Sequence, residues 1–343
     1  MSPASGLSIA GLTTRYGHGR SALTAVDGID LTLAPGSILG LVGESGSGKS
    51  SLARALVGLA PVSAGTITLD GACLTGAGRP AARRRRRVQM VFQDPYSSLD
   101  PRMSIGESIA EAVRAAGSRS RARRGGEVER LLDLVGLDQS LAGGLPRALS
   151  GGQRQRVAIA RALGARPRVL IADEITSALD VSVQGAVLNL VRDLQRELGL
   201  SVLFISHNLA VVHHIADTIA VMYCGKIVEI APAGALVARP QHPYTRALVA
   251  AARPGCATES AAESDGELLV ADPPDPRDPP AGCRFHPRCP DGPLGRSTDR
   301  EICRHADPGS EAAGRPHRAA CFFAADPATT DPATISPAGT RTP

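Results

Sequence analysis

The sequence predicts an α/β fold built on a mostly parallel sheet with helices on both faces. Three short runs, at 37–42, 168–172 and 201–206, are almost entirely apolar. Strands buried on both faces have this continuous apolar character, whereas strands with one wet face alternate apolar and polar residues. Residues 181–199 place apolar side chains at helical spacing, so strands and helices alternate as they do around a parallel sheet.

Composition divides the chain into three parts. We expect the α/β domain to span residues 1–235, with a helical insertion at about 95–165, where good strands are lacking. Residues 236–323 would form a small C-terminal domain that contains cysteines and a proline-rich connector at 272–282. The tail, 324–343, is rich in Ala, Pro and Thr, a composition typical of disorder.

The net charge of +5 and the run of five arginines at 83–87 raise the question of nucleic-acid binding. Lys49 and Lys226 are the only lysines, so all but two of the 38 basic residues are arginines. Together with heavy use of Ala, Gly and Pro, this indicates codon bias rather than selection for phosphate contacts. A solvated basic loop or face explains the run without a nucleic-acid partner.

No segment of the sequence has the character of a membrane span or a secretion signal. The longest apolar stretch, 200–221, is interrupted by His207, Asn208 and Asp217, so it falls short of the roughly 18 uninterrupted residues that a span requires. The N-terminus lacks a basic start followed by an apolar segment. We therefore expect the chain to stay inside the cell.

The stretch GESGSGKSS matches the phosphate-loop pattern G-x-x-x-x-G-K-[ST], between a predicted strand and a predicted helix. Glycines allow backbone N–H groups to converge on phosphate oxygens at the positive end of the helix. Lys49 would pair with the β- and γ-phosphates, and the Ser50 hydroxyl would complete a Mg²⁺ shell. This context argues against a plain glycine turn. The loop residues expected to contact a nucleotide are Gly43, Glu44, Ser45, Gly46, Ser47, Gly48, Lys49, Ser50 and Ser51.

Two adjacent acids, Asp173 and Glu174, follow the apolar run at 168–172. They would lie at the carboxyl edge of the sheet, where parallel sheets bind nucleotides. Asp173 suits water-mediated coordination of Mg²⁺, and Glu174 is placed to polarise the attacking water of phosphoryl transfer. Such a pair can also cap a following helix, but the phosphate loop favours the chemical role.

The stretch LSGGQRQR, at 149–156, resembles the signature of ATP-binding-cassette (ABC) ATPases, which are P-loop NTPases with a RecA-like core and a helical subdomain. Further family motifs agree in order and spacing. They are the phosphate loop, Gln93 in VFQDP, the signature itself, Asp173–Glu174, SALD at 177–180 and His207 in ISHNL. The resemblance implies an ABC nucleotide-binding domain that hydrolyses ATP with Mg²⁺, followed here by a small cysteine-containing C-terminal extension.

In this family two cassettes pack head to tail, and each nucleotide lies between the phosphate loop of one subunit and the signature of the other. The resemblance therefore implies that Ser150, Gly151, Gly152 and Gln153 face a phosphate held by another chain. N–H donors at the start of a helix suit an anion. Asp180 would bridge the two subunits.

The resemblance also implies roles for residues around the reacting phosphate. Gln93 would sense Mg²⁺ and water and connect the site to the helical subdomain, and His207 would contact the γ-phosphate and hold the attacking water with Glu174. Tyr16 resembles the aromatic residue that stacks on adenine, with an ordinary surface tyrosine as the alternative. Ile175 stands where the family usually has proline, for which we expect a small change in loop stiffness and no lost chemistry.

Three stretches resemble the ATPase subunits of oligopeptide, dipeptide and nickel importers, namely 43–51, 91–107 and 241–252. The second is closest to the F-type partner of the paired ATPases in those systems. This implies a peripheral protein at the cytoplasmic face of the plasma (inner) membrane. Its partners would be a second ATPase subunit in a heterodimer, two transmembrane permeases and an extracytoplasmic substrate-binding protein, with no nucleic acid.

The substrate stays open among dipeptides, oligopeptides, nickel chelates and glutathione, because selectivity belongs to the other subunits. One alternative is a soluble ABC ATPase of a phosphonate-degrading complex, a group that largely lacks a segment like 231–323. The other is a cassette acting on nucleic acid or ribosomes, which usually carries two cassettes or a long coiled coil.

Four of the seven cysteines, Cys283, Cys289, Cys303 and Cys321, have the spacing C-x₅-C-x₁₃-C-x₁₇-C. Zinc sites favour C-x₂₋₄-C, so the spacing suits zinc poorly. A cysteine followed by proline and four thiolates in loop-rich sequence suit an iron–sulfur cluster better, and the importer resemblance implies a [4Fe–4S] cluster there. Zinc and unliganded thiols remain open, whereas disulfides are not expected in a reducing cytosol.

Two further cysteines lie in the α/β part of the chain. Cys73 and Cys224 are expected to be ordinary buried thiols.

Overall fold

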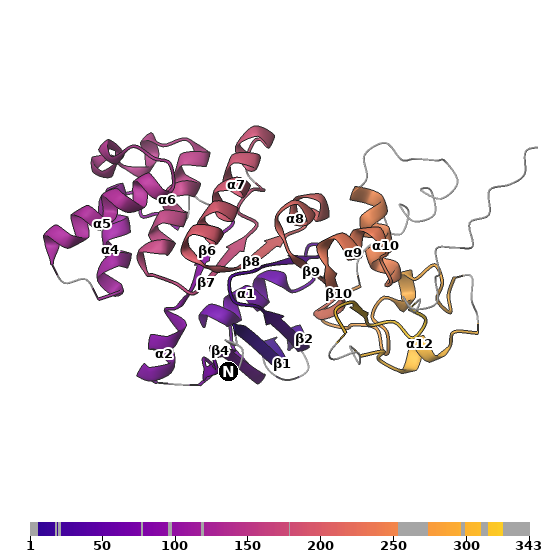
Figure 1. Ribbon diagram of the computed structural model, residues 1–343. Helices are drawn as coiled ribbons and strands as arrows, with labels where there is room; N and C mark the ends of the chain where they lie inside the picture. The colour runs from indigo at the N-terminus through magenta and orange to yellow at the C-terminus, as the bar shows by residue number, and fades with distance from the viewer. Residues whose placement is uncertain are drawn as a thin grey trace, which may run out of the picture.

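The computed structural model describes residues 6–17, 19, 22–76, 78–94, 98–117, 120–177, 179–252, 274–295, 299–309 and 315–324. Residues 325–343 of the predicted disordered tail and Cys256 lie outside the described residues. In Figure 1 a group of helices gathers at one end, the C-terminal residues at the other, and the sheets lie between them.

The larger sheet has seven strands in the order β11-β10-β9-β3-β8-β7-β6. The parallel strands are β3 (Ile38–Val42), β6 (Val88–Val91), β7 (Val169–Asp173), β8 (Ser201–Ser206) and β9 (Thr218–Tyr223). Strands β10 (Lys226–Pro232) and β11 (Arg318–Ala319) extend it with antiparallel pairing. Every residue of β3, β7 and β8 is buried, which explains their continuous apolar sequences and confirms the α/β prediction.

A second, four-stranded antiparallel sheet lies beside the first, in the order β2-β1-β4-β5. Its strands are β1 (Leu7–Tyr16), β2 (Leu23–Leu33), β4 (Ala64–Leu69) and β5 (Ala72–Cys73). The sequence did not predict it, because register shifts between β1 and β2 interrupt the alternation of apolar and polar residues. Helix α1 (Lys49–Val57) lies between the two sheets, with Leu52 and Leu56 fully buried against both.

Helices α4, α5 and α6 pack against one another at the end of the molecule away from the C-terminal residues (Figure 1). Capping boxes begin two of them, at Ser104 with Glu107 and at Ser150 with Gln153. Besides α1, the described helices of the cassette are α2 (Arg79–Arg85), α4 (Ile105–Ala115), α5 (Arg121–Leu134), α6 (Gly151–Gly164), α7 (Val181–Leu198) and α8 (Leu209–Ile215).

The C-terminal part begins with α9 (Ala233–Ala238) and α10 (Pro243–Ala252) and continues as loops with a 3₁₀ turn at His286–Arg288 and α12 (Ile302–His305). Pairing of Glu229 with Ala319 ties it to the large sheet. Among the described helices, none combines the length and apolar character needed to cross a bilayer. The domain boundaries stay a prediction.

The expectation for Cys73 is wrong, because its thiol is exposed. Cys73 ends β5, a two-residue edge strand, so no layer covers it. Cys224 is half-buried, in a turn between β9 and β10.

Candidate nucleotide-binding site

Three neighbouring strands of the large sheet end at one edge, beside a cavity that residues following β3 and β7 line. Asp173 and His207 stand at the same edge but are not among the described residues that line this cavity. The phosphate loop follows β3, Asp173 and Glu174 stand at the end of β7, and His207 follows β8. The carboxyl ends of parallel strands share one edge, so these groups converge there. The cavity has a volume of about 360 Å³. Its wall includes Ser45, Gly46, Gly48, Lys49, Ser50, Ser51, Gln93 and Glu174.

Backbone geometry explains the glycines of the phosphate loop. Gly46 and Gly48 have φ values of 78° and 106°, which residues with a side chain rarely adopt. A Cβ on Gly48 would stand 2.2 Å from the Ala25 carbonyl oxygen, and one on Gly43 would stand 2.1 Å from that of Met222. The loop therefore keeps its shape only with glycine at these positions.

Lys49 and Ser50 occupy the start of α1, inside the loop. The Lys49 ammonium donates to the carbonyl oxygens of Gly43 at 2.7 Å and Glu44 at 2.8 Å. Burial lowers the pKa of Lys49, while the nearby Glu174 and Asp173 carboxylates oppose that shift. Such a buried, donor-rich cation suits a phosphate.

The Ser50 hydroxyl donates to Asp173 Oδ1 at 3.3 Å. Burial raises the pKa of Asp173, and the bond from Ser50 opposes this. A hydroxyl and a buried carboxylate beside a phosphate loop are the hard oxygen donors that Mg²⁺ prefers. The residues present therefore fit the predicted magnesium site.

Glu174 adopts a left-handed backbone conformation with φ 48°, which a non-glycine residue reaches only against strain. Its N–H donates to the Ile205 carbonyl at 2.9 Å, which pins the turn to β8. Its Oε1 lies 3.4 Å from His207 Nδ1. Ile175, the departure from the family pattern, is buried at 2% exposure and belongs to the larger hydrophobic core.

The signature residues lie apart from this cavity. Ser150 is the N-cap of α6, and its hydroxyl accepts from the N–H of Gln153. Among the described residues that line the cavity, Ser150, Gly151, Gly152 and Gln153 are absent. Asp180, the N-cap residue of α7, is exposed.

Tyr16 is half-buried and is not among the residues that line the cavity. Its cross-strand partner in β2, Leu23, does line it. The stacking role of Tyr16 stays a prediction.

Arg288 and Tyr244 contact the phosphate loop and were missed by the sequence analysis. Arg288 donates to both carboxylate oxygens of Glu44, at 3.0 and 3.3 Å, and Tyr244 accepts from the Glu44 N–H at 2.9 Å. The two residues stand 244 and 200 positions from Glu44. No motif or spacing signals a contact across that distance.

The four C-terminal cysteines line one small cavity beside Phe285 and His242. Burial raises the pKa of Cys283 to about 11 and that of Cys289 to about 12, and it also raises those of Cys303 and Cys321. Within the described residues, no group of three or more His, Cys, Asp or Glu side chains is arranged to hold a metal ion. The described residues therefore do not support the predicted iron–sulfur cluster.

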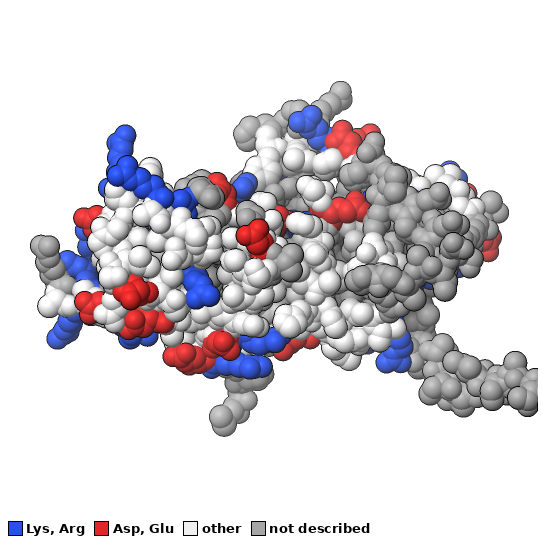
Figure 2. Space-filling model, turned by 90° about the horizontal axis from the view of Figure 1, so that it is seen from above, with Lys and Arg blue, Asp and Glu red and all other residues white. Residues whose placement is uncertain are grey.

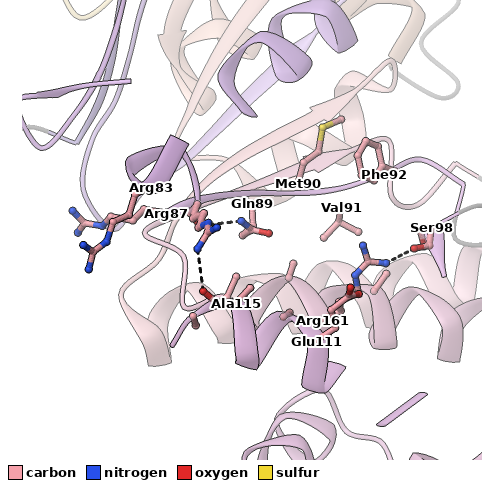
Figure 3. Close-up of a pocket in the computed structure, with 16 residues that line it drawn as sticks. Arg83, Arg87, Gln89, Met90, Val91, Phe92, Ser98, Glu111, Ala115 and Arg161 are labelled. Atoms are coloured by element: carbon pink, nitrogen blue, oxygen red, sulfur yellow. Dashed lines mark hydrogen bonds between the residues drawn. The ribbon is translucent and has the colours of Figure 1, made fainter. Parts of the chain in front are cut away.

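A second cavity, of about 520 Å³, lies between β6 and the helices α2, α4 and α6 (Figure 3). Arginines stand at both ends, with Arg83 and Arg87 at one and Arg161 at the other (Figure 3). Small side chains of α4 and α6 form much of its wall, namely Ala112, Ala115, Ala116, Ala158, Ala162 and Ala165. Phe92 lines this cavity, and its neighbour Gln93 lines the nucleotide cavity.

The arginine run 83–87 does not act as one charged surface. Arg87 pairs with Asp70 at 3.3 Å, Arg86 donates to the Ala115 carbonyl, and Arg85 donates to the carbonyl of Leu74. On the face shown in Figure 2, basic and acidic side chains alternate around broad uncharged areas. The run thus serves local contacts and the wall of the second cavity.

Comparison with known proteins agrees with this geometry. The ABC transporter family model matches residues 26–177, and the model of the oligopeptide/dipeptide transporter C-terminal region matches 228–292. A putative peptide import ATP-binding protein of Brucella abortus is 46% identical over 295 residues, which cover 84% of each chain. One of Brucella ovis is 46% identical over 285 residues, which cover 83% of this chain and 89% of that relative.

Solved structures give the same fold. The dimeric post-hydrolysis state of the ATP-binding cassette MJ0796, bound to ADP and Pi, matches with a TM-score of 0.60 and 26% identity, over 66% of this chain and 98% of that one. CbiO1 from Clostridium perfringens, part of the ABC transporter complex CbiONQ, matches with a TM-score of 0.61 and 26% identity, over 68% and 91%. The chain therefore belongs to the ABC transporter ATP-binding proteins whose cassette is followed by the oligopeptide/dipeptide transporter C-terminal region.

Proposed function

We propose that this chain hydrolyses ATP at the described cavity and thereby energises the import of peptides through a membrane complex. The observation that carries the proposal is the convergence of the phosphate loop, Asp173, Glu174 and His207 at one edge of the sheet. The relatives named peptide import ATP-binding proteins and the shared C-terminal region support peptides as the substrate class.

Each side chain has a stated part in hydrolysis. Lys49 leaves the loop carbonyls to pair with the β- and γ-phosphates, and Ser50 and Asp173 would hold a Mg²⁺ ion, which would neutralise phosphate charge. Glu174 accepts a proton from the attacking water while the new oxygen–phosphorus bond forms. The bond from the γ-phosphorus to the bridging oxygen breaks, and ADP leaves with phosphate. His207 orients the water and the γ-phosphate, and Gln93 would contact a bound Mg²⁺ ion and the water.

A second ATPase subunit completes the site. Ser150 and the glycines after it offer N–H donors at the start of α6 but stand apart from the cavity of their own chain. An anion held by another cassette would occupy that helix end. The partner is a sister ATPase in a heterodimer, and Asp180 and Tyr16 complete the contacts to that subunit and to adenine.

The permeases dock in the second cavity. A short helix of a permease would lie against the alanines of α4 and α6 that line this cavity, and the arginines of the cavity suit acidic side chains on that helix. Phe92 in this cavity is followed directly by Gln93 in the nucleotide cavity. A shift of the docked helix would therefore move Phe92 and, through the peptide bond between them, Gln93 at the nucleotide. The chain would lie at the cytoplasmic face of the membrane.

The cysteine cavity is proposed to hold an iron–sulfur cluster. Four cysteines from separate loops line one small cavity, and cysteine thiolates are the usual ligands of iron–sulfur clusters. The chain purified without oxygen should contain iron and acid-labile sulfide, and Cys303→Ser should lose both. Stoichiometric zinc, or neither element, would contradict the cluster.

The experiment that tests the function is purification of the tagged Glu174→Gln chain from native membranes in mild detergent with ATP. This change keeps the nucleotide and stops turnover, so the closed complex should persist. Mass spectrometry should identify a sister ATPase and two multi-span permeases. Glu129→Gln, a change of an exposed glutamate on α5, serves as the matched control and should not enrich the closed complex. Recovery of soluble phosphonate-degrading enzymes, or of ribosomes, would overturn the import proposal.

A further inference from the structure

The C-terminal part of the chain holds the phosphate loop at Glu44. Arg288 donates from Nη1 to Glu44 Oε2 at 3.0 Å and from Nη2 to Oε1 at 3.3 Å, so its planar guanidinium faces both carboxylate oxygens. The exposed fractions of the two side chains are 6% for Arg288 and 22% for Glu44. Solvent therefore screens this pair much less than it screens a surface ion pair.

Glu44 connects this pair to the lysine of the loop. Its carboxylate contacts Arg288, its N–H donates to the hydroxyl oxygen of the fully buried Tyr244 at 2.9 Å, and its carbonyl accepts from Lys49 Nζ at 2.8 Å. Tyr244 thus holds the peptide unit whose Gly43 carbonyl also accepts from Lys49, and Arg288 holds the side chain of Glu44. The position of the lysine depends on residues outside the cassette motifs.

Arg288 is itself held rigidly. It donates to the Tyr223 hydroxyl at 3.2 Å. The Tyr223 ring packs against those of Tyr244 and Phe285, with centroid distances of 4.7 and 5.2 Å. Aromatic packing of this kind leaves little rotamer freedom, so the guanidinium meets Glu44 in a prearranged position.

A second arginine of the same segment reaches the other side of the loop. Arg284 donates to the Asp27 carboxylate and to the Cys224 carbonyl. The next residue, Gly225, donates from its N–H to the Ser47 carbonyl at 2.8 Å. The segment 284–288 therefore contacts the phosphate loop directly at Glu44 and indirectly at Ser47.

We infer that Arg288 is a positioning residue of the nucleotide site, which makes the C-terminal part a component of ATP binding. The inference rests on the proposed ATPase function and adds a residue to it. Glu44 belongs to the phosphate loop, and its carboxylate repels a triphosphate bound by that loop unless a cation neutralises it. Arg288 removes the repulsion and keeps the Glu44 carbonyl in place for Lys49.

A double-mutant cycle at these two residues tests the inference on the full chain. Arg288→Ala leaves the Glu44 charge beside the phosphates and should weaken binding of a fluorescent ATP analogue by about tenfold. Glu44→Gln alone removes the charge that Arg288 neutralises, and its affinity supplies the reference for the double variant. The double variant has no uncompensated charge, so it should recover most of the lost affinity. Melting temperatures without nucleotide are measured in parallel.

Two further variants complete the design. Arg246→Ala breaks the pair with Asp291, another ion pair of the C-terminal part, and should leave nucleotide affinity unchanged. Arg288→Lys keeps the charge and loses the two-point contact, so its affinity should be intermediate; it replaces Arg288→Ala if that variant fails to fold.

Rescue by Glu44→Gln separates the electrostatic role from a merely structural one. Wild-type affinity in Arg288→Ala, or a double variant as weak as the single one, would overturn the inference while leaving the ATPase proposal intact. A wild-type chain that binds no ATP would overturn both.

Discussion

His207 Nδ1 lies 3.4 Å from Glu174 Oε1, across the gap between two neighbouring parallel strands. The histidine is largely exposed, with 58% of its side chain accessible, whereas 17% of the Glu174 side chain is. The less exposed carboxylate is thus next to an imidazole that can reach toward bound phosphate. This arrangement suits a base and an orienting group that share one water.

His207→Ala should lower ATP turnover by about 10²-fold with little change in ATP affinity, because the histidine orients the reacting groups rather than holding the loop. Turnover under saturating ATP and equilibrium binding of an ATP analogue measure the two effects. His213→Ala, at an exposed position on α8, should behave as wild type. A loss of affinity equal to the loss of turnover would contradict the assigned role.

Gly48→Ala should abolish nucleotide binding. Gly48 has φ 106°, and an added Cβ would stand 2.2 Å from a backbone oxygen, so the loop must change shape. Gly125→Ala is the matched control, since the space around that helical glycine is open; there we expect a stability gain of about 0.5–1 kcal/mol. Isothermal titration with ATP and thermal unfolding distinguish the two variants. Normal ATP binding by Gly48→Ala would refute the described loop geometry.

Ala115→Trp should fill the cavity between α2, α4 and α6 and release the permeases while ATP binding persists. Ala115 is exposed at the end of α4 and lines this cavity, so the change adds bulk without disturbing the core. Ala238→Trp, also on an exposed helical position, is the control. Co-purification of permeases from membranes is the readout. Undiminished recovery with Ala115→Trp would show that docking occurs elsewhere.

His242 should make the protein sensitive to acid. Its Nδ1 accepts a hydrogen bond from the Tyr244 N–H at 3.1 Å, and burial lowers its pKa from 6.5 to about 4, an effect that Glu229 opposes and Arg246 reinforces. Between these two values the unfolded chain binds a proton that the folded chain does not. Neutral His242 therefore costs the folded state no stability above pH 6.5. The free energy of unfolding falls as the pH drops from 6.5 toward 4.

We expect the free energy of unfolding to fall by about 2 kcal/mol between pH 7 and pH 5 through this residue. His242→Gln keeps an acceptor for Tyr244 but cannot titrate, so its denaturation curves should depend less on pH by that amount. His305→Gln, at a side chain with 78% exposure, should retain the wild-type dependence. Equal acid sensitivity in His242→Gln and wild type would show that other groups cause it.

The sequence predicted those elements of the molecule that are determined by residues close together in the chain. Continuous apolar runs predict β3, β7 and β8 because those strands are buried on both faces. The phosphate loop follows from glycine geometry within nine residues. The antiparallel sheet was not predicted, because bulges in β1 interrupt the alternation of apolar and polar residues along that strand.

The contact of Arg288 with Glu44 was not predicted from the sequence, for a different reason. It joins residues 244 positions apart, and it depends on the aromatic packing of Tyr223, Tyr244 and Phe285. Only the assembled fold brings the two together. The wall of the second cavity, which includes arginines of the run 83–87, could likewise not be predicted from the sequence.

The most direct test of the account is ATP turnover by the purified membrane complex with and without peptide-loaded binding protein, for wild type and for Glu174→Gln. We predict that the loaded binding protein stimulates the wild-type complex, and that Glu174→Gln binds ATP normally but loses at least about 10²-fold in turnover. Turnover by Glu174→Gln close to that of wild type, or a complex indifferent to peptide, would contradict the account.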